Sequence, residues 1–226
     1  MSGSEYVGTL IIMDKKGRER VRKIAAASRR YEDQNVDKRI IKFLEPADVK
    51  GTAMLIFDND EGDDDMWIYM PSLRKTRRIV SSDKGKSFMG SEFSNADMAA
   101  ENSADFTYTF LGVEETDGEP CWKVGVVPND EEIADDNGFS RKIMWLSQND
   151  FVARRIIFYD FYDELLKEQT NRNIILVDED NNKYRAGEMI MVNVQNGRKS
   201  IMRMDKVVFN PNVKDEYFTT RYLEKP

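Results

Sequence analysis

The side chains on which most enzymes and metal sites depend are sparse in this chain. Histidine is absent from all 226 residues, which excludes Ser-His and Cys-His nucleophilic sites and metal sites built on imidazole. The single cysteine, Cys121, precedes Trp122 in a strand-like apolar run, where a thiol is typical of a small buried hydrophobic side chain. No glycine-rich phosphate-binding loop of either common form occurs. The chemistry left to the chain is that of carboxylates and of apolar binding.

Two acidic segments invite a calcium hypothesis, but neither has the spacing of an EF-hand. Counted from Asp58, such a loop needs glycine at the sixth place and glutamate at the twelfth, where the chain has Asp63 and Tyr69. A count from Asp178 fails in the same way. We therefore expect solvated hairpin loops, no cofactor and no metal. Paired carboxylates can also cleave glycosides, but among 41 acidic residues the sequence singles out no pair.

A basic segment stands out against an acidic chain. The 34 Lys and Arg residues and 41 Asp and Glu residues give a formal charge of −7. Nucleic-acid binding is not expected, because a duplex binder needs a dominant positive field. Arg74, Lys75, Arg77 and Arg78 nevertheless lie close together. They fit contact with an anionic head group or an acidic partner, and equally an exposed edge strand whose charges discourage aggregation.

Short β-branched and aromatic runs, separated by polar turns, predict a mainly β chain. We expect a first hairpin from residues 7–13 and 18–27, with its turn at residues 15–17. The last hairpin, residues 188–194 and 200–209, turns at Asn196-Gly197, the strongest short hairpin signal. Further strands are predicted over residues 37–44, 52–57, 66–70, 76–80, 105–113, 121–127, 142–147, 152–161 and 174–177.

Helices are predicted to be few and short. Ser94 can cap a helix that has Asp97 at its third position, and the flanking Phe93 and Met98 can form a hydrophobic staple. Two other segments are candidates: residues 45–51, with proline near the start and glycine at the end, and residues 129–137, which could also be a loop.

The chain shows no internal repeat, no linker and no break in composition, so we expect one domain over residues 1–226. Residues 1–5 contain no signal peptide and fit a disordered start or one left by trimming, with any native leader removed. No apolar run approaches the roughly 18 to 20 residues needed to span a bilayer.

Several strands are apolar in a way that could line a cavity. Residues 66–70 and 156–159 are apolar on both faces, as expected if one face packs on the body and the other lines a cavity. The 12 methionines have flexible side chains that can mould to an irregular ligand or simply fill a core. Alternation predicts the following side chains in an apolar cavity or its lid: Met54, Ile56, Trp67, Tyr69, Phe88, Met89, Phe93, Met98, Phe106, Trp122, Trp145, Ile157, Tyr159, Met189, Met191, Met202 and Met204. The segment Ser87–Ala100 is predicted as the lid or rim, or as an ordered loop packed on the sheet.

Several blocks of the sequence resemble the outer membrane lipoprotein-sorting protein family, a LolA-like group within the LolA-LolB superfamily. The resemblance runs from about Tyr6 to the C-terminus. It is carried by the segments Phe43–Ala53, Asp64–Lys75, Ser87–Phe93, Asn196–Ser200 and Phe218–Glu224.

The resemblance implies a mainly β (α+β) fold, in which a strongly curved antiparallel sheet forms an unclosed half-barrel covered by a few short helices and loops. It implies a non-enzymatic periplasmic carrier of a lipid or of an acylated lipoprotein, active in outer membrane biogenesis in a Gram-negative bacterium, with transient membrane contact. Because members are often associated with large lipid exporters, the alternative is an adaptor subunit docked on an inner-membrane transporter. An apolar cavity of several hundred cubic ångströms would favour the carrier, a filled interior the adaptor, and converging carboxylates an enzyme.

Overall fold

The computed structural model describes residues 3–60, 62–179, 182–209 and 212–225. The strands within these residues are β1 Gly3–Met13, β2 Glu19–Tyr31, β3 Val36–Glu45, β4 Ala53–Asn59, β5 Asp65–Met70, β6 Lys75–Arg78, β7 Phe106–Thr116, β8 Glu119–Pro128, β9 Arg141–Ser147, β10 Ala153–Tyr159, β11 Leu165–Asp178, β12 Lys183–Asn193 and β13 Arg198–Phe209. The helices are α1 Ser81–Lys84, α2 Glu131–Asn137 and α3 Thr220–Leu223, with short 3₁₀ turns η1 Ala96–Met98, η2 Ser103–Asp105 and η3 Asp215–Phe218. Within the described ranges, no helix is long and apolar enough to cross a membrane.

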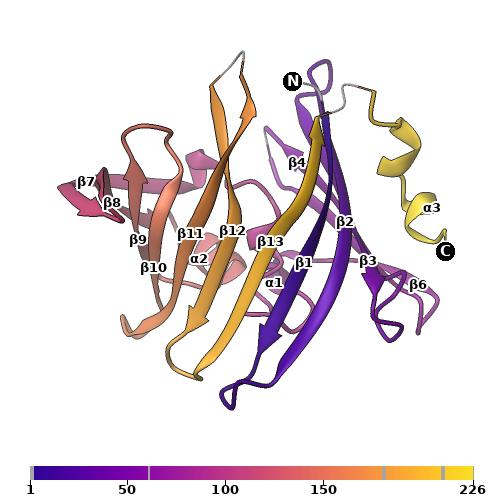
Figure 1. The fold of residues 1–226 in the computed structure, drawn as a ribbon, viewed down its shortest axis with the longest axis horizontal. Helices are drawn as coiled ribbons and strands as arrows, with labels where there is room; N and C mark the ends of the chain where they lie inside the picture. The colour runs from indigo at the N-terminus through magenta and orange to yellow at the C-terminus, as the bar shows by residue number, and fades with distance from the viewer. Residues whose placement is uncertain (1–2, 61, 180–181, 210–211, 226) are drawn as a thin grey trace.

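All thirteen strands form one antiparallel sheet in the order β6-β5-β4-β3-β2-β1-β13-β12-β11-β10-β9-β8-β7 (Figure 1). The strands β1 to β6 pair in sequence order, as do β7 to β13, and the two halves are joined by pairing of β1 with β13, the first and last strands. In the described chain, the edge strands β6 and β7 do not pair with each other, so the sheet curves without closing into a barrel. The predicted mainly β half-barrel is confirmed.

The local predictions hold where turn chemistry is strong. The first hairpin and the hairpin at Asn196-Gly197 both form, and the predicted capping motif is present. Ser94 Oγ accepts a hydrogen bond from the Asp97 N–H at 3.1 Å, and Asp97 Oδ2 accepts one from the Ser94 N–H at 2.7 Å. Residues 46–51 form a hydrogen-bonded turn in which the Lys50 N–H donates to the Pro46 carbonyl at 3.0 Å, the spacing of one helical turn, although Glu45 belongs to β3. Residues 131–137 are helical.

Two segments are more regular than the sequence predicts. Gly3 to Glu5, expected in a disordered start, belong to β1 and pair with the end of β13; Met1 and Ser2 lie outside the described residues. Strand β11 begins at Leu165 rather than near residue 174. The buried positions of its first half are polar, Lys167, Gln169 and Asn171, so that half lacks the apolar alternation that identifies a strand in sequence.

Apolar side chains form separate clusters on the two faces of the sheet. The inner, concave face carries the larger cluster, where Leu10, Phe43 and Met191 are almost fully buried beneath Phe88 and Phe93. Helices α1 and α2 lie on this side of the sheet, whereas α3 lies outside it (Figure 1). The outer cluster is made by the C-terminal segment, which packs Val213, Phe218 and Leu223 against the outer side chains Ile40 and Leu55. The inner and outer faces of β2–β5 are thus buried by different parts of the chain.

We expect Phe88→Ala to lower the free energy of unfolding by about 3–5 kcal/mol, because Phe88 is fully buried and its ring packs 5.8 Å from the Phe43 ring. Urea denaturation followed by fluorescence measures the change. The control is Leu73→Ala, at a position 53% exposed, which should change stability by less than about 0.5 kcal/mol. Equal effects of the two substitutions would contradict the packing of residue 88 in the core.

Candidate ligand-binding cavity

The inner face of the sheet changes from apolar to basic along its strands. On β12, Met191 is fully buried and Met189 packs on the core, while Arg185, on the same side of the strand, lines an open cavity. On β3, Phe43 is buried in the core and Arg39 lines the cavity. Alternate residues of a strand share a face, so these residues form two continuous layers across several strands. The basic layer lies toward the end of the sheet that carries the N-terminus (Figure 1).

The apolar layer is filled by the segment Ser87–Ala100. Phe88, Phe93 and Met98 of this segment are buried in the inner cluster. Hydrogen bonds from the sheet hold the segment in place: Arg22 Nη1 donates to the Met89 carbonyl at 2.6 Å, and Ser200 Oγ accepts from the Glu92 N–H at 2.9 Å. The segment predicted as a lid or an ordered loop is therefore packed inside the half-barrel, on the sheet.

The open cavity holds about 860 Å³ between the ends of β1, β2, β3, β12 and β13 and the loop before β10. That volume lies within the usual range of about 300–1,000 Å³ for small-molecule sites. Its apolar lining includes Val152, Val177, Met204 and Val207, and its polar lining includes Tyr6, Arg39 and Arg185. A space with both kinds of lining suits an amphipathic ligand better than a purely apolar one.

A buried carboxylate stands behind the cavity wall. Asp58 Oδ1 accepts a hydrogen bond from the Ala100 N–H at 2.8 Å, and Arg39 Nη2 lies 3.5 Å from Asp58 Oδ2. Oδ2 has no hydrogen-bond partner among the described residues. Burial raises the pKa of Asp58, and the Arg39 charge opposes that rise. Arg39 also donates to the Met98 carbonyl, so one guanidinium ties the cavity wall to the end of η1.

Tyr6 and Arg185 face the same space as Arg39. Burial raises the pKa of the Tyr6 hydroxyl, and the charges of Arg39 and Arg185 oppose that rise. Burial, followed by repulsion from Arg39, lowers the pKa of Arg185. The Arg185 side chain is nevertheless exposed to the solvent in the cavity. Two guanidinium groups and one hydroxyl therefore line the same cavity, close enough for their charges to interact.

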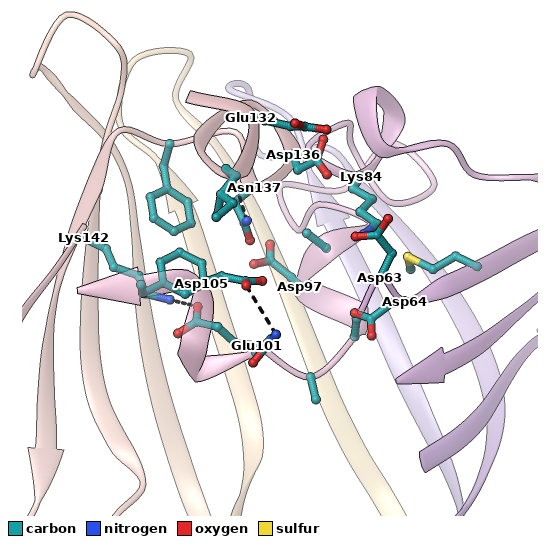
Figure 2. A pocket seen from close by; sticks show the side chains of 18 of the residues that line it. Asp63, Asp64, Lys84, Asp97, Glu101, Asp105, Glu132, Asp136, Asn137 and Lys142 are labelled. Carbon is teal, nitrogen blue, oxygen red and sulfur yellow. Dashed lines mark hydrogen bonds and ion pairs between the residues drawn. The ribbon is translucent and has the colours of Figure 1, made fainter. Parts of the chain in front are cut away.

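A second pocket, of about 460 Å³, has eight acidic side chains in its lining and lies beside α2 and η1 (Figure 2). Its carboxylates are those of Asp63, Asp64, Asp97, Glu101, Asp105, Asp130, Glu132 and Asp136, with Lys84 and Lys142 also in the wall. Lys142 forms an ion pair with Glu101. In the part of the chain that the structure describes, no three acidic or thiol groups converge so as to hold a metal ion. The carboxylates are spread around the wall of this pocket.

Many of the predicted cavity residues lie on the inner face, but most of those fill the core. Of the predicted set, Met204 lines the open cavity. Trp122 is half-buried, and its ring lies 5.6 Å from the Phe151 ring near the cavity. The following predicted residues belong to the inner cluster or pack against it: Met54, Ile56, Phe88, Met89, Phe93, Met98, Phe106, Met189, Met191 and Met202.

Other predicted residues lie on the outer face. Trp67 packs with its ring 5.1 Å from the Phe57 ring, and both it and Tyr69 join the outer cluster beneath the C-terminal segment. Their neighbours Met66 and Ile68 take the inner positions of β5. The placement differs from the prediction because β5 is apolar on both faces, and such a strand does not reveal which face turns inward.

In β9 and β10 the predicted residues are likewise one position away from those that face inward. Ile156 and Phe158 belong to the inner cluster, so the predicted Ile157 and Tyr159 alternate with them and face outward. Trp145, paired with Arg155 in the sheet, likewise faces outward, where its Nε1 donates to Glu114 at 2.8 Å.

The basic segment forms the turn before β6 and the edge strand itself. Arg78 makes an ion pair with Asp65, and Thr76 Oγ1 donates to Glu224 at 2.8 Å. Neither Arg74, Lys75, Arg77 nor Arg78 lines the 860 Å³ cavity. The segment therefore lies on an edge of the sheet, as expected if its charges discourage aggregation. Contact with an anionic head group or an acidic partner stays a prediction.

Sequence reasoning missed the residues that give the cavity its polar character, Tyr6, Arg39 and Arg185. The signal was present in the two-residue period: Arg185 is in phase with Met189 and Met191, and Arg39 is in phase with Phe43. A basic side chain in phase with inward-facing apolar ones indicates a charge that points into the interior.

We expect the Asp64 carboxyl of the acidic pocket to titrate near pH 6, because burial and the charge of Asp58 raise its pKa to about 6. The folded state then holds this proton more tightly than the unfolded chain, whose value is 3.8, so this group makes stability fall as pH rises from about 4 to about 6. Asp64→Asn should remove that fall. Carboxyl-detected NMR measures the pKa, and Asp58→Asn should lower it; an unchanged Asp64 midpoint would refute the coupling.

Comparison with solved structures shows the same fold in three bacterial proteins. A domain from Vibrio parahaemolyticus assigned to outer membrane lipoprotein sorting superposes with a TM-score of 0.89 at 26% identity, over 99% of this chain and 92% of that one. A DUF1329 family protein from Desulfovibrio piger gives 0.89 at 26% identity, over 98% and 91%. A LolA superfamily protein from Nitrosomonas europaea gives 0.72 at 20% identity, over 98% and 91%.

A comparison with curated proteins gives no match. A family model described as "Uncharacterized protein" matches residues 35–225, which is most of the chain. The protein therefore belongs to that uncharacterised family, and its fold is the LolA-like fold of the outer membrane lipoprotein-sorting domains.

Proposed function

We propose that this protein is a non-enzymatic periplasmic carrier, which takes a lipid or a lipoprotein acyl chain into the inner side of its half-barrel and transfers it between the inner and outer membranes. The observation that carries the proposal is the 860 Å³ cavity, which lies on the same strands as the apolar core. Likeness to a domain assigned to outer membrane lipoprotein sorting supports it.

The physical basis of binding would be transfer of acyl methylenes out of water. Each buried methylene contributes about 0.8 kcal/mol, so even a partly enclosed chain gains several kcal/mol. Met204 and Val207 offer apolar contacts at the cavity wall. Beyond them the interior is already filled, so a longer chain enters further only if Phe88 and Phe93 move aside with their segment.

The segment Ser87–Ala100 is accordingly proposed to act as a replaceable plug. In the unloaded protein the aromatic rings of this segment cover the apolar layer, and cargo would compete with these rings for the same surface. Polar contacts with the sheet also hold this segment. In addition to the bonds from Arg22 and to Ser200, Arg198 pairs with Glu92 at 3.0 Å and Lys167 pairs with Asp97 at 3.2 Å, so cargo would have to break these contacts to displace the segment. Such competition would keep affinity moderate, which a carrier needs in order to release its cargo.

An adaptor role on an inner-membrane transporter is the second candidate. It is favoured by the filled apolar layer, and by a groove of about 390 Å³ on the outer face, beside Tyr217 and Tyr222 of the C-terminal segment. An adaptor would present such a groove to a partner and would need no cargo in the half-barrel. The two candidates therefore differ in whether lipid occupies the inner face.

Native mass spectrometry of protein purified without detergent, followed by organic extraction, tests the carrier. We expect a bound mass that extracts as phospholipid or acylated peptide. Protein that stays free of ligand after incubation with phospholipid vesicles would overturn the carrier and favour the adaptor.

A pair of neighbouring substitutions makes this test specific to the cavity. Val207 lines the cavity, whereas Val208, the next residue of β13, lines the groove on the outer face. Val207→Trp should reduce the bound lipid several-fold because the indole occupies cavity volume, and Val208→Trp should leave it unchanged. The reverse result would place the lipid on the outer face.

A further inference from the structure

Arg29, Arg30 and Asp150, at the rim of the cavity, are each held in ion pairs. Arg30 forms ion pairs with Asp37 at 3.2 Å and with Asp60 at 2.5 Å, and Arg29 pairs with Asp215 at 2.8 Å. Asp150, another acidic residue of the lining, forms an ion pair with Arg154. These pairs tie the strand ends together and offset the charges of Arg29 and Arg30, while Lys38 and Lys183 add further positive charge to the lining.

Arg185 is the exception among the guanidinium groups of the lining. Its side chain forms no hydrogen bond or ion pair with any other residue in the described part of the chain. It projects from the inner side of β12, in phase with Met189, into the open cavity. A guanidinium has five donors in a fixed planar fork, so an arginine placed here is ready to bind a planar or tetrahedral anion.

Two further donors, Arg39 and the Tyr6 hydroxyl, line the same cavity as Arg185. Arg39 is only partly neutralised, because its neighbour Asp58 lies 3.5 Å away and burial disfavours the charged form of that carboxylate. The Tyr6 hydroxyl makes no hydrogen bond with another described residue, and the charges of both arginines act on it. Arg39 and Arg185 repel each other, and this repulsion adds to the larger effect of burial in lowering the pKa of Arg185. An anion bound between them would relieve that repulsion.

The position of this basic group relative to the apolar lining gives the ligand a direction. Met204 and Val207 lie on β13 beside the basic group, and β13 continues from there to the buried Met202 of the core. A ligand with a charged head and an apolar tail could therefore place its head at Arg185 and direct its tail along the strands toward the plug segment.

We propose that the basic part of this cavity binds the anionic phosphate or carboxylate group of an amphiphile, with Arg185 as the principal ligand and Arg39 and the Tyr6 hydroxyl as additional donors. This inference rests on the proposed carrier function and specifies its cargo: an anionic lipid rather than a neutral one. Free phosphate shares the same recognition chemistry, so the test must separate the two sources.

The size of the effect follows from the bonds lost. Hydrogen bonds to charged groups contribute enough that removing a bidentate guanidinium should cost about tenfold or more in affinity. A neutral head group gains little from Arg185 and leaves its charge partly desolvated. Discrimination between anionic and neutral heads on the same tail is therefore the signature of the site.

Titration calorimetry with decyl phosphate, decyl maltoside and inorganic phosphate, each below any micelle concentration, measures this discrimination on the full chain. We expect decyl phosphate to bind about tenfold or more tightly than decyl maltoside. Arg185→Gln should abolish that preference while leaving the affinity for decyl maltoside unchanged, and Arg185→Lys should retain part of it. The matched control is Arg172→Gln, at an exposed arginine of the neighbouring strand β11 that does not line the cavity, and it should change neither affinity.

The outcomes separate the inference from the function on which it rests. Equal binding of decyl phosphate and decyl maltoside, unaffected by Arg185→Gln, would overturn the anion site and leave the carrier standing. Failure of both amphiphiles to bind would overturn the carrier and the anion site together. Inorganic phosphate binding as tightly as decyl phosphate, and depending on Arg185, would overturn a lipid source for the anion.

Discussion

The pairing of β1 with β13 is the interaction on which the rest of the structure depends. It joins strands from the two ends of the chain, and without it the sheet would separate into β1–β6 and β7–β13. The register shifts between Val7 and Gly8, where Asp205 is the extra residue of the bulge. Gly8 is required there because a Cβ atom would lie 2.6 Å from the Arg203 carbonyl oxygen. Asp205 is held by Thr9 Oγ1 at 2.5 Å and by Lys23, and these bonds help to lower its pKa to about 2.

The bulge also marks the boundary between the two layers of the inner face. Below it, Leu10 pairs with Met202 and both are buried in the core; above it, Tyr6 pairs with Val207 and both line the cavity. A bulge bends its strand and increases the local twist, so it changes the direction of the sheet at the point where the interior changes from apolar to polar. The filled and open parts of the half-barrel are therefore consequences of one local irregularity in the central strand pair.

An unclosed sheet has two edges and two faces, and each is protected differently. The inner face is covered by a segment of the chain that follows β6, and part of the outer face is covered by the C-terminal segment. The edge strand β6 is short and basic, and β7 carries a bulge with Leu111 as its extra residue, both of which discourage pairing with another chain. Covering the inner face with the chain's own Phe88 and Phe93 protects the apolar layer in water. The same arrangement requires cargo to displace those rings, which links stability to release.

The sequence by itself determined the local features of this protein. Strand alternation and turn residues predicted most of the strands and both terminal hairpins, and the Ser94–Asp97 motif predicted its own capping hydrogen bonds. These features depend on residues close together in the chain, so their signals survive without knowledge of the fold. The sequence did not determine whether Trp67 and Ile157 point to the inner or the outer face, because a strand that is apolar on both sides contains no signal for which side turns inward.

Only the tertiary structure brought Tyr6, Arg39 and Arg185 around one cavity, and only it filled the apolar layer with residues 87–100. Tyr6, Arg39 and Arg185 come from β1, β3 and β12, and their proximity depends on the pairing of β1 with β13 between the ends of the chain. Whether an inward-facing side chain lines a cavity or fills a core depends on what lies opposite it across the half-barrel. That neighbour belongs to a distant part of the sequence, and so no local pattern could predict it.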